Sequence, residues 1–459
     1  MSSRKRKPPV DIDSERTNKS STKKPKPNEH SSRTSSKTKK DALAPPQFPL
    51  RSELDIRNAS VLACGSGDMY QLGLGPDVME AKRPRPIPEL SNTHIRQLVA
   101  GGASNAAILV DPDSGKESVW TWGCNDLYAL GRRTNGEDDQ ITPKSITGLT
   151  DVVQVSVGDN HMLALKSNGQ VYYWGCYRDM NGILGFKFES KATKQLNPEL
   201  LDISLKKKIV QIASGENSSF ALTDGGKVYV WGDARICLRT SPRTNTRYCG
   251  LKPSIILCNQ KFKKIFAGGF HVLLIAADGA LWALGLNNYS QLGVDESLEL
   301  TTRPRRVLGL PPNIEIKMAA AGQHHTLLLT QDGQVYSWGR GDYGQLGHGD
   351  TDPQPYPKKV EAFERLLKGD KVVQISTGGH HCLATTQNGE VYAWGFGDMA
   401  QLGVGVDEDK LVPEKLDNTN PKSHLTGKKV VWASGGGQHS VFLATPVPEA
   451  ASLRRKKMK

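Results

Sequence analysis

Seven glycines at nearly constant spacing constrain the fold of this chain more than any other feature. Each follows a small or aromatic residue at the end of an apolar run, at Gly65, Gly123, Gly175, Gly232, Gly285, Gly339 and Gly395. The gaps between them run from 52 to 58 residues. A repeat of this length indicates an array of supersecondary units, because one unit alone cannot bury its apolar face. Function is therefore expected where a unit departs from the repeat.

The unit that contains Gly339 is the clearest example of the repeat. Residues 321–347 predict a strand, a tight turn at Asp332 and Gly333, a second strand and a glycine-rich loop. An Asp-Gly pair between two alternating apolar runs is typical of a two-residue hairpin turn. Helical periodicity is confined to a short stretch near residues 361–368. Seven units of this length predict an all-β fold, a seven-bladed propeller with about four strands in each blade.

The two ends of the array complement each other. Residues 61–73 contain only the second half of a unit, and residues 430–443 contain only a first half. We expect these halves to share one blade, because such a blade closes the ring and leaves no open sheet edge. The predicted organisation is a tail of residues 1–60, one propeller over residues 61–445 and a second tail of residues 446–459.

Residues 1–40 and 446–459 account for the whole formal charge of the chain, which is +13. Residues 1–40 carry +9 and residues 446–459 carry +4. The first tail holds almost no apolar residues, so it is predicted to be disordered. Two interpretations remain for its basic residues: nuclear import alone, or import together with contact to DNA phosphates in chromatin. The first basic cluster consists of Arg4, Lys5, Arg6 and Lys7.

Several classes of protein are not expected. The seven cysteines are odd in number and show no C-x-x-C spacing, which predicts neither a disulfide framework nor a zinc site, and indicates a reducing intracellular compartment. The sequence shows no secretory signal and no run near the ~18 apolar residues that a membrane span needs. Walker, G-x-S-x-G and H-E-x-x-H motifs are missing, so no enzyme chemistry, metal or cofactor is predicted.

Two sets of polar residues recur in equivalent positions of the units and are expected to be structural. One histidine follows each x-Gly-x-x pattern and is predicted to form hydrogen bonds within the scaffold: His161, His271, His325, His381 and His439. An Asp or Asn lies three residues after most strand-ending glycines, where it could cap its own loop as an Asx turn: Asp68, Asp126, Asn288, Asp342 and Asp398.

The residues between the repeat glycine and the repeat histidine vary from unit to unit. Equivalent loops of a propeller lie around one face near the central channel, so these variable side chains are predicted to form a docking surface. Asp159, Asn217 and His324 are its most prominent members.

Two loops depart from the repeat. From the strand-ending glycine to the glycine of the Leu-Gly pair takes 10 residues in the third unit and 8 in most others. The longer loop is predicted to project a small hairpin that carries Arg178 and Asp179. The fourth unit lacks its Gln-Leu-Gly ending and carries Arg239, Arg243 and Arg247, which suit an acidic or phosphate surface.

The G-G-x-H and W-G-x-x-x-x-x-Q-L-G units over residues 61–445, with the longer loop at 174–185, resemble the regulator of chromosome condensation family. The resemblance implies a chromatin-bound guanine-nucleotide exchange factor for the GTPase Ran, in the nucleus, that stabilises nucleotide-free Ran without covalent chemistry. The implied partners are Ran, the nucleosome and a nuclear import receptor, with the protein itself a monomer. The alternatives are a non-catalytic chromatin or scaffold propeller of the same fold, or another protein built from these repeats.

The resemblance also assigns residues. Exchange is assigned to Asp159, Asn217 and His324, with Asn217 standing where the family pattern has an aspartate. A wedge that presses on the GTPase is assigned to Tyr177, Arg178, Asp179, Asn181, Ile183 and Leu184. The remaining GTPase-binding face is assigned to Asp68, Asp126, Asn288 and His380. Nucleosome contact is assigned to Arg239, Arg243 and Arg247, together with the basic cluster of the first tail.

Overall fold

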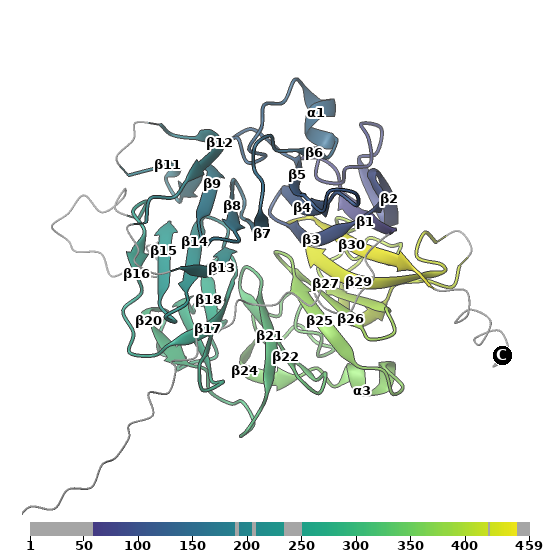
Figure 1. Ribbon diagram of the computed structural model, residues 1–459. Coiled ribbons are helices and arrows are strands. Elements are labelled where there is room, and N and C mark those ends of the chain that lie inside the picture. Colours follow the sequence, from purple (N-terminus) through teal and green to yellow (C-terminus); the bar gives the residue numbers. More distant parts are fainter. Residues whose placement is uncertain (1–57, 189–191, 204–207, 234–249, 421–422, 448–459) are drawn as a thin grey trace, which may run out of the picture. The chain divides into compact units, whose positions relative to one another are not determined.

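The computed structural model describes residues 58–188, 192–203, 208–233, 250–420 and 423–447. Within these ranges the chain forms seven four-stranded antiparallel sheets, a two-stranded hairpin and two short helices (Figure 1). The prediction of a seven-bladed all-β propeller is therefore confirmed. Residues 1–57 and 448–459 of the predicted tails, and the arginines at 239, 243 and 247, lie outside the described residues, whereas Ala59, Ser60 and Pro446, which were predicted to belong to the tails, lie in strands.

The strands of the blades are as follows. Blade 1 holds β29 (Lys428–Gly435), β30 (His439–Pro446), β1 (Ala59–Ser66) and β2 (Glu80–Thr93). Blade 2 holds β3 (Ile95–Ala100), β4 (Ser104–Val110), β5 (Glu117–Gly123) and β6 (Lys144–Ser145). Blade 3 holds β7 (Val152–Val157), β8 (His161–Lys166), β9 (Val171–Gly175) and β12 (Gln195–Leu200). Blade 4 holds β13 (Ile209–Ser214), β14 (Ser218–Thr223), β15 (Val228–Gly232) and β16 (Ser254–Ile255).

The remaining elements complete the ring. Blade 5 holds β17 (Phe262–Ala267), β18 (His271–Ala276), β19 (Leu281–Leu286) and β20 (Leu300–Arg306). Blade 6 holds β21 (Ile316–Ala321), β22 (His325–Thr330), β23 (Val335–Gly339) and β24 (Gln354–Lys359). Blade 7 holds β25 (Val372–Thr377), β26 (His381–Thr386), β27 (Val391–Gly395) and β28 (Lys410–Lys415). The hairpin is β10 (Tyr177–Asp179) with β11 (Gly182–Gly185), and the helices are α1 (Glu137–Ile141) and α3 (Ala362–Leu366).

The chain closes the ring as the two half units predict. Strand β1 pairs antiparallel with β30, with Ser60 opposite Ala444 and Gly65 opposite His439. The first strands of neighbouring blades contact one another all the way around, including β29 of blade 1 with β3 of blade 2. The helix α3 was expected from the sequence, whereas α1 was not.

The strand-ending glycines are required by both conformation and space. At Gly175 the φ angle is +91°, and a Cβ atom would lie 2.2 Å from the carbonyl oxygen of Asn160, which directly precedes the neighbouring strand. At Gly395 the corresponding values are +96° and 2.6 Å, to the carbonyl oxygen of His380. A side chain at either place would meet backbone that cannot move aside. The spacing of these glycines therefore records the end of the third strand in every blade.

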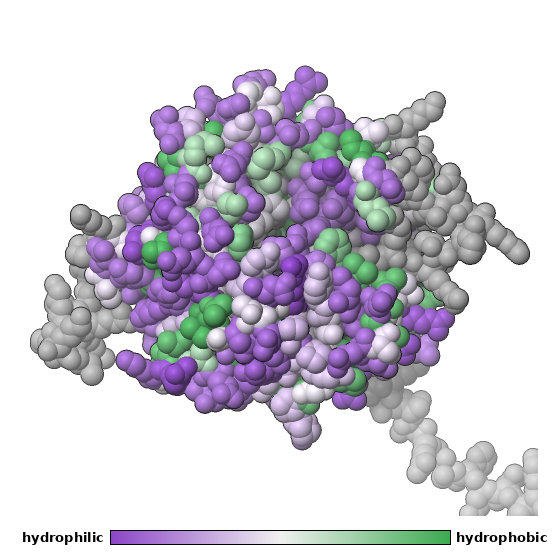
Figure 2. Space-filling model, turned by 180° about the vertical axis from the view of Figure 1, so that it is seen from behind, coloured by the Kyte–Doolittle hydropathy of each residue, from purple (hydrophilic) through white to green (hydrophobic). Residues whose placement is uncertain are grey.

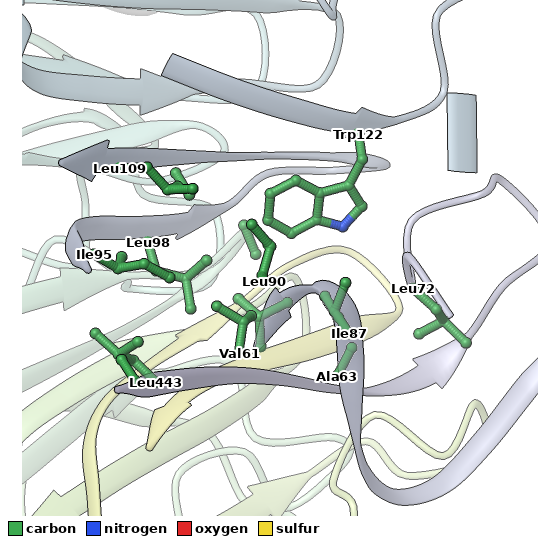
Figure 3. Close-up of a cluster of buried hydrophobic side chains, with 14 of the residues drawn as sticks. Val61, Ala63, Leu72, Ile87, Leu90, Ile95, Leu98, Leu109, Trp122 and Leu443 are labelled. Atoms are coloured by element: carbon green, nitrogen blue, oxygen red, sulfur yellow. The ribbon is translucent and has the colours of Figure 1, made fainter. Parts of the chain in front are cut away.

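The hydrophobic core lies between adjacent blades. The fully buried tryptophans next to the strand-ending glycines fill these spaces: Trp122, Trp174, Trp231, Trp338 and Trp394. In Figure 3 the indole of Trp122 points into a cluster that includes Ile87 and Leu90 from blade 1 and Leu98 from blade 2. Gly73 of blade 1 lies against the same indole, where its missing side chain leaves the room that the ring occupies. Blades are therefore held by their neighbours, as in other repeat arrays.

Side chains also bridge every pair of neighbouring first strands. All seven first strands contain a register shift, just before the third residue in six of them and before the fifth, Trp432, in β29, and the shift breaks the alternation of the strand. At four of these positions a buried glutamine bonds the next blade. Gln154 donates to the carbonyl oxygen of Ile212 at 2.7 Å and accepts from its N–H at 3.0 Å. In the other blade pairs, the side chain that donates a hydrogen bond to a backbone carbonyl of the next blade is Gln97, Gln211, Lys264, Lys317, Gln374 or Trp432.

The surface seen in Figure 2 is mostly hydrophilic, and its hydrophobic residues form small separate groups. No helix in the described ranges is long and apolar enough to cross a membrane. A docking surface on this side of the molecule is therefore expected to depend on polar groups and isolated apolar contacts.

Candidate functional site

The loops that join first and second strands gather at one end of the central channel. They line a single cavity of about 140 Å³ to which every blade contributes. Its wall is mostly backbone, because glycines such as Gly102, Gly215 and Gly436 recur around it. The charged side chains among its described lining residues are Asp159 and Glu216. The predicted convergence of these loops near the channel is thus observed, and we call this end the loop face.

Asp159 and Glu216 form a coupled pair on adjacent blades. The N–H of Asp159 donates to the carbonyl oxygen of Glu216 at 2.9 Å, which holds the two loops together. Burial, followed by the charge of Glu216, raises the pKa of Asp159 to about 7, and Arg178 opposes this shift. Burial also raises the pKa of Glu216, against a hydrogen bond from the side chain of Gln323. Near neutral pH the pair readily takes up a cationic or proton-donating group.

Glu216 was not among the sequence-predicted site residues, although it stands next to Asn217 in the same variable loop. Glu216 was missed because the sequence does not show that its side chain is buried. The signal that could have identified it is its position, which is equivalent to that of Asp159 in the preceding blade.

The longer third loop forms the predicted hairpin, with β10 paired to β11. Met180 at its tip is 86% exposed and Ile183 is 43% exposed. Arg178 and Asn181 are also exposed, and Asp179 accepts the backbone N–H of Asn181 at 2.8 Å, which shapes the tip. The tip therefore presents apolar and charged groups together. Met180 was missed by the sequence reasoning, which named the residues on either side of it.

Two predicted wedge residues form the base of the hairpin, so their assignment to the contacting surface is wrong. Tyr177 is fully buried, and its hydroxyl lies 2.9 Å from the Ser219 hydroxyl of blade 4. Its ring packs 4.5 Å from that of His161, measured between centroids. Leu184 is 3% exposed and belongs to the core shared by blades 3 and 4. The hairpin therefore stands on a rigid support.

Asn217 ties the hairpin to blade 4. Its side-chain oxygen accepts the backbone N–H of Arg178 at 3.0 Å. The amide of Asn217 thus holds the start of the hairpin in place, so Asn217 has a positioning role. The structure brings Asn217 next to the hairpin, and brings Asp159 next to Glu216, along the same side of the loop face.

His324 lies across the face, among aromatic rings. Its ring stacks on Phe270 at a centroid distance of 5.1 Å and approaches Tyr289 at 4.8 Å. Burial, then the charges of Arg340 and His380, lower the pKa of His324 to about 4. His324 is therefore neutral near pH 7 and can accept or donate a hydrogen bond.

His380 extends the same cluster to blade 7. It lies 5.3 Å from Tyr343 and 6.5 Å from Phe396. Arg340 sits between the two halves, 4.9 Å from the ring of Tyr289 and 5.6 Å from that of Tyr343. An arginine among tyrosines is a composition typical of interaction surfaces. The aromatic residues were missed because each occurs singly in its own repeat.

The five repeat histidines are buried. Four of them bond to the next blade, for example His439 Nε2 to Asn105 Oδ1 at 2.7 Å and His381 Nε2 to Ser440 Oγ at 2.9 Å. The same role falls to His271 with Thr326 and to His325 with Cys382. The prediction that these histidines form hydrogen bonds within the scaffold is confirmed for these four, whereas His161 is buried against the ring of Tyr177.

The interpretation of the recurring Asp and Asn residues as caps of their own loops is wrong. The glutamine of the Gln-Leu-Gly ending makes the cap: Gln71 accepts the N–H of Met69 at 2.8 Å, and Gln401 accepts that of Met399 at 3.0 Å. Buried Gln291 and Gln345 do the same in their blades. The acidic and amide residues then remain exposed at the surface: Asp68, Asp126, Asn288, Asp342 and Asp398.

Within the described ranges no three His, Cys, Asp or Glu side chains gather in a way that could hold a metal ion. What the loop face offers is a carboxylate pair, a supported hairpin and an aromatic–histidine cluster. These groups can bind and press on a partner, and their arrangement contains no nucleophile paired with a base.

A model of the RCC1-like domain matches residues 60–442. The chain belongs to the RCC1-like domain family. This RCC1-like propeller is 32% identical over 442 residues to the guanine nucleotide exchange factor SRM1 of Saccharomyces cerevisiae, covering 84% of the chain and 88% of the relative. It is 32% identical over 403 residues to the regulator of chromosome condensation of Xenopus laevis, covering 83% and 90%. The resemblance inferred from the sequence is confirmed.

A solved structure agrees with the RCC1-like architecture. The crystal structure of Prp20p from Saccharomyces cerevisiae, described with its binding properties to Gsp1p and histones, has a TM-score of 0.78 and 34% identity. The match covers 88% of this chain and 96% of that one. The longer third loop and the variable loop residues of this RCC1-like propeller therefore lie on a framework that the relatives share.

Proposed function

We propose that this protein is a guanine-nucleotide exchange factor for the GTPase Ran. The observation that carries the proposal is the β10–β11 hairpin, a supported projection with an exposed Met180, beside the carboxylate pair of Asp159 and Glu216. The name of the related guanine nucleotide exchange factor SRM1 supports the same activity.

Exchange by such a face requires no bond chemistry. The face binds nucleotide-free Ran more tightly than loaded Ran, so by thermodynamic linkage it weakens GDP and GTP binding, and the nucleotide weakens the complex in return. The direction of net exchange then follows the cellular ratio of GTP to GDP.

Each part of the face has a role in this scheme. The hairpin tip enters the nucleotide-binding region of the GTPase, and its buried base keeps it from being pushed aside. Asp159 and Glu216 offer a negative site for cationic groups that the departing phosphates leave unpaired. His324 and its aromatic neighbours bind the rest of the GTPase surface. Asp68, Asp126, Asn288 and His380 extend that surface.

The proposal includes chromatin. The basic tail of residues 1–60 and the arginines at 239, 243 and 247 are proposed to anchor the protein to nucleosomes, and the tail to carry it through nuclear import. Histone binding by the related Prp20p supports this part. The protein would then generate Ran-GTP near chromosomes.

The test is release of fluorescent mant-GDP from purified Ran. The full chain should accelerate release, and the Asp159→Asn and His324→Ala variants should slow it at least tenfold while remaining folded. Asp278→Asn is the matched control, because Asp278 is exposed in a hairpin turn at the opposite ends of the strands. Failure of the wild-type chain to accelerate release would overturn the proposal.

A further inference from the structure

The central channel contains a second cavity, which lies along the first strands. Its volume is about 480 Å³, and the first strands of all seven blades line it. It shares Ala100, Val157 and Thr377 with the cavity of the loop face, so the two are successive parts of one channel. The exchange proposal makes no use of this part of the channel.

The charge in this cavity is of one sign. Lys264 and Lys317 are the charged side chains among its described lining residues, and no carboxylate lines it. Both lysines are half-buried and lie on neighbouring blades, on β17 and β21. The other lining side chains are apolar or neutral, such as the amides of Gln154 and Gln374.

The hydrogen bonds by which the two lysines connect neighbouring blades do not require a charged side chain. Lys264 Nζ donates to the carbonyl oxygen of Lys317 at 2.9 Å, and Lys317 Nζ donates to that of Val373 at 2.7 Å. In four other blades a neutral glutamine makes the equivalent bridge with two hydrogen bonds instead of one. Each ammonium has three donors, so two on each remain beyond the bridging bond.

The positive charge in the channel is poorly compensated. Burial lowers the pKa of Lys264, and the charge of Lys263 lowers it further. Burial likewise lowers the pKa of Lys317, with added repulsion from Lys371 and Lys264. A bound anion would relieve both effects, because it supplies the missing opposite charge in a site of low dielectric. The hydroxyl of Ser214 also lines the channel, buried and without a hydrogen-bond partner among the described residues.

We propose that this part of the channel binds a small multivalent oxyanion of the phosphate class between Lys264 and Lys317. Several charged acceptor oxygens on one compact group match the remaining donors of the two ammonium groups. The lysines lie within the channel wall, bonded to the backbone of the first strands, so a free small anion reaches them and a folded partner does not. The site is independent of Ran binding.

The experiment is isothermal titration calorimetry of the full chain with sodium pyrophosphate, against sodium chloride at equal ionic strength. One pyrophosphate should bind per chain, with no heat of binding from chloride. Lys264→Gln introduces the residue found in four equivalent positions, and Lys317→Val introduces the residue found at the equivalent Val153, Val210 and Val373. Each variant should fold normally and bind about tenfold more weakly or worse, since it loses a charge-assisted contact.

The control is Lys261→Gln, an exposed lysine on the same blade that does not line the cavity. This variant should bind pyrophosphate as the wild type does. Equal weakening by Lys261→Gln, or unchanged binding in the double variant of Lys264 and Lys317, would overturn the site. Displacement of pyrophosphate by an equimolar DNA duplex would also overturn it, because the lysines would then belong to a nucleic-acid surface.

Discussion

The contact between Asn217 and the β10–β11 hairpin makes a quantitative prediction about exchange. Replacing Asn217 with alanine removes the acceptor of the Arg178 N–H, a neutral and partly exposed hydrogen bond of 3.0 Å. Such a bond contributes about 0.5–1.5 kcal/mol. At 1.4 kcal/mol for each factor of ten, the equilibrium constant between the correctly held and the released hairpin falls about two- to tenfold. The rate of mant-GDP release from Ran should fall by up to the same factor.

Two measurements separate this positioning role from direct contact. Hydrogen exchange of the Arg178 amide should become faster in Asn217→Ala, and should stay slow in Asn217→Asp, because a carboxylate accepts the same bond. Asn217→Asp should therefore retain exchange activity. Asn168→Ala, at an exposed turn of blade 3, is the control. A loss beyond a hundredfold with unchanged protection of the Arg178 amide would refute the reasoning, because Asn217 would then act on the GTPase directly.

Three further predictions concern the scaffold beneath the face. Tyr177→Phe removes the buried bond to Ser219 and should lower the free energy of unfolding by about 1 kcal/mol, measured by denaturant titration. Gln154→Ala leaves the N–H and carbonyl of Ile212 unpaired between two blades and should lower it by about 2–6 kcal/mol in the same assay. Because the pKa of Asp159 is raised to about 7 on folding, the wild type should lose thermal stability relative to Asp159→Asn as the pH rises from about 4 to about 7.

Each of these has a matched control on the same scaffold. Tyr172→Phe changes a partly exposed tyrosine of β9, and Gln170→Ala an exposed glutamine before it, and both should leave the free energy of unfolding within about 0.5 kcal/mol. Asp68→Asn makes the same substitution at an exposed aspartate and should leave the free energy of unfolding within about 0.5 kcal/mol. A stability difference between wild type and Asp159→Asn that is flat with pH would contradict the assigned pKa shift, and equal effects of Gln154→Ala and Gln170→Ala would contradict the bridging role.

The sequence predicted those features that depend on count and spacing. The strand-ending glycines require a fixed backbone conformation, so their period gave the number of blades, and the half units at residues 61–73 and 430–443 gave the closure. The third loop, with its two additional residues, gave the hairpin. The sequence could also separate the repeat histidines, such as His439, from the variable residues beside them.

Features that depend on side-chain direction could not be predicted. The register shift in β7 turns its third residue toward the next blade, so Gln154 bridges blades where simple alternation would not place it. For the same reason Lys264 of β17 reaches the channel. Tyr177 is buried and Met180 is exposed because of the way β10 pairs with β11. The sequence alone does not show which side of this short hairpin each residue occupies. The exposure of Asp68 could not be predicted either, because it depends on Gln71, and not Asp68, accepting the backbone N–H that caps the loop.

The pairing of β1 with β30 has a consequence for how the protein is made. Residues near position 60 leave the ribosome long before their partners near position 444, so β1 keeps a strand edge without its final partner during synthesis of the other blades. Contacts between such distant residues also make folding slow. The growing chain is consequently most exposed to misassociation just before its last strands emerge, and a chaperone that shields β1 should raise the yield of closed rings.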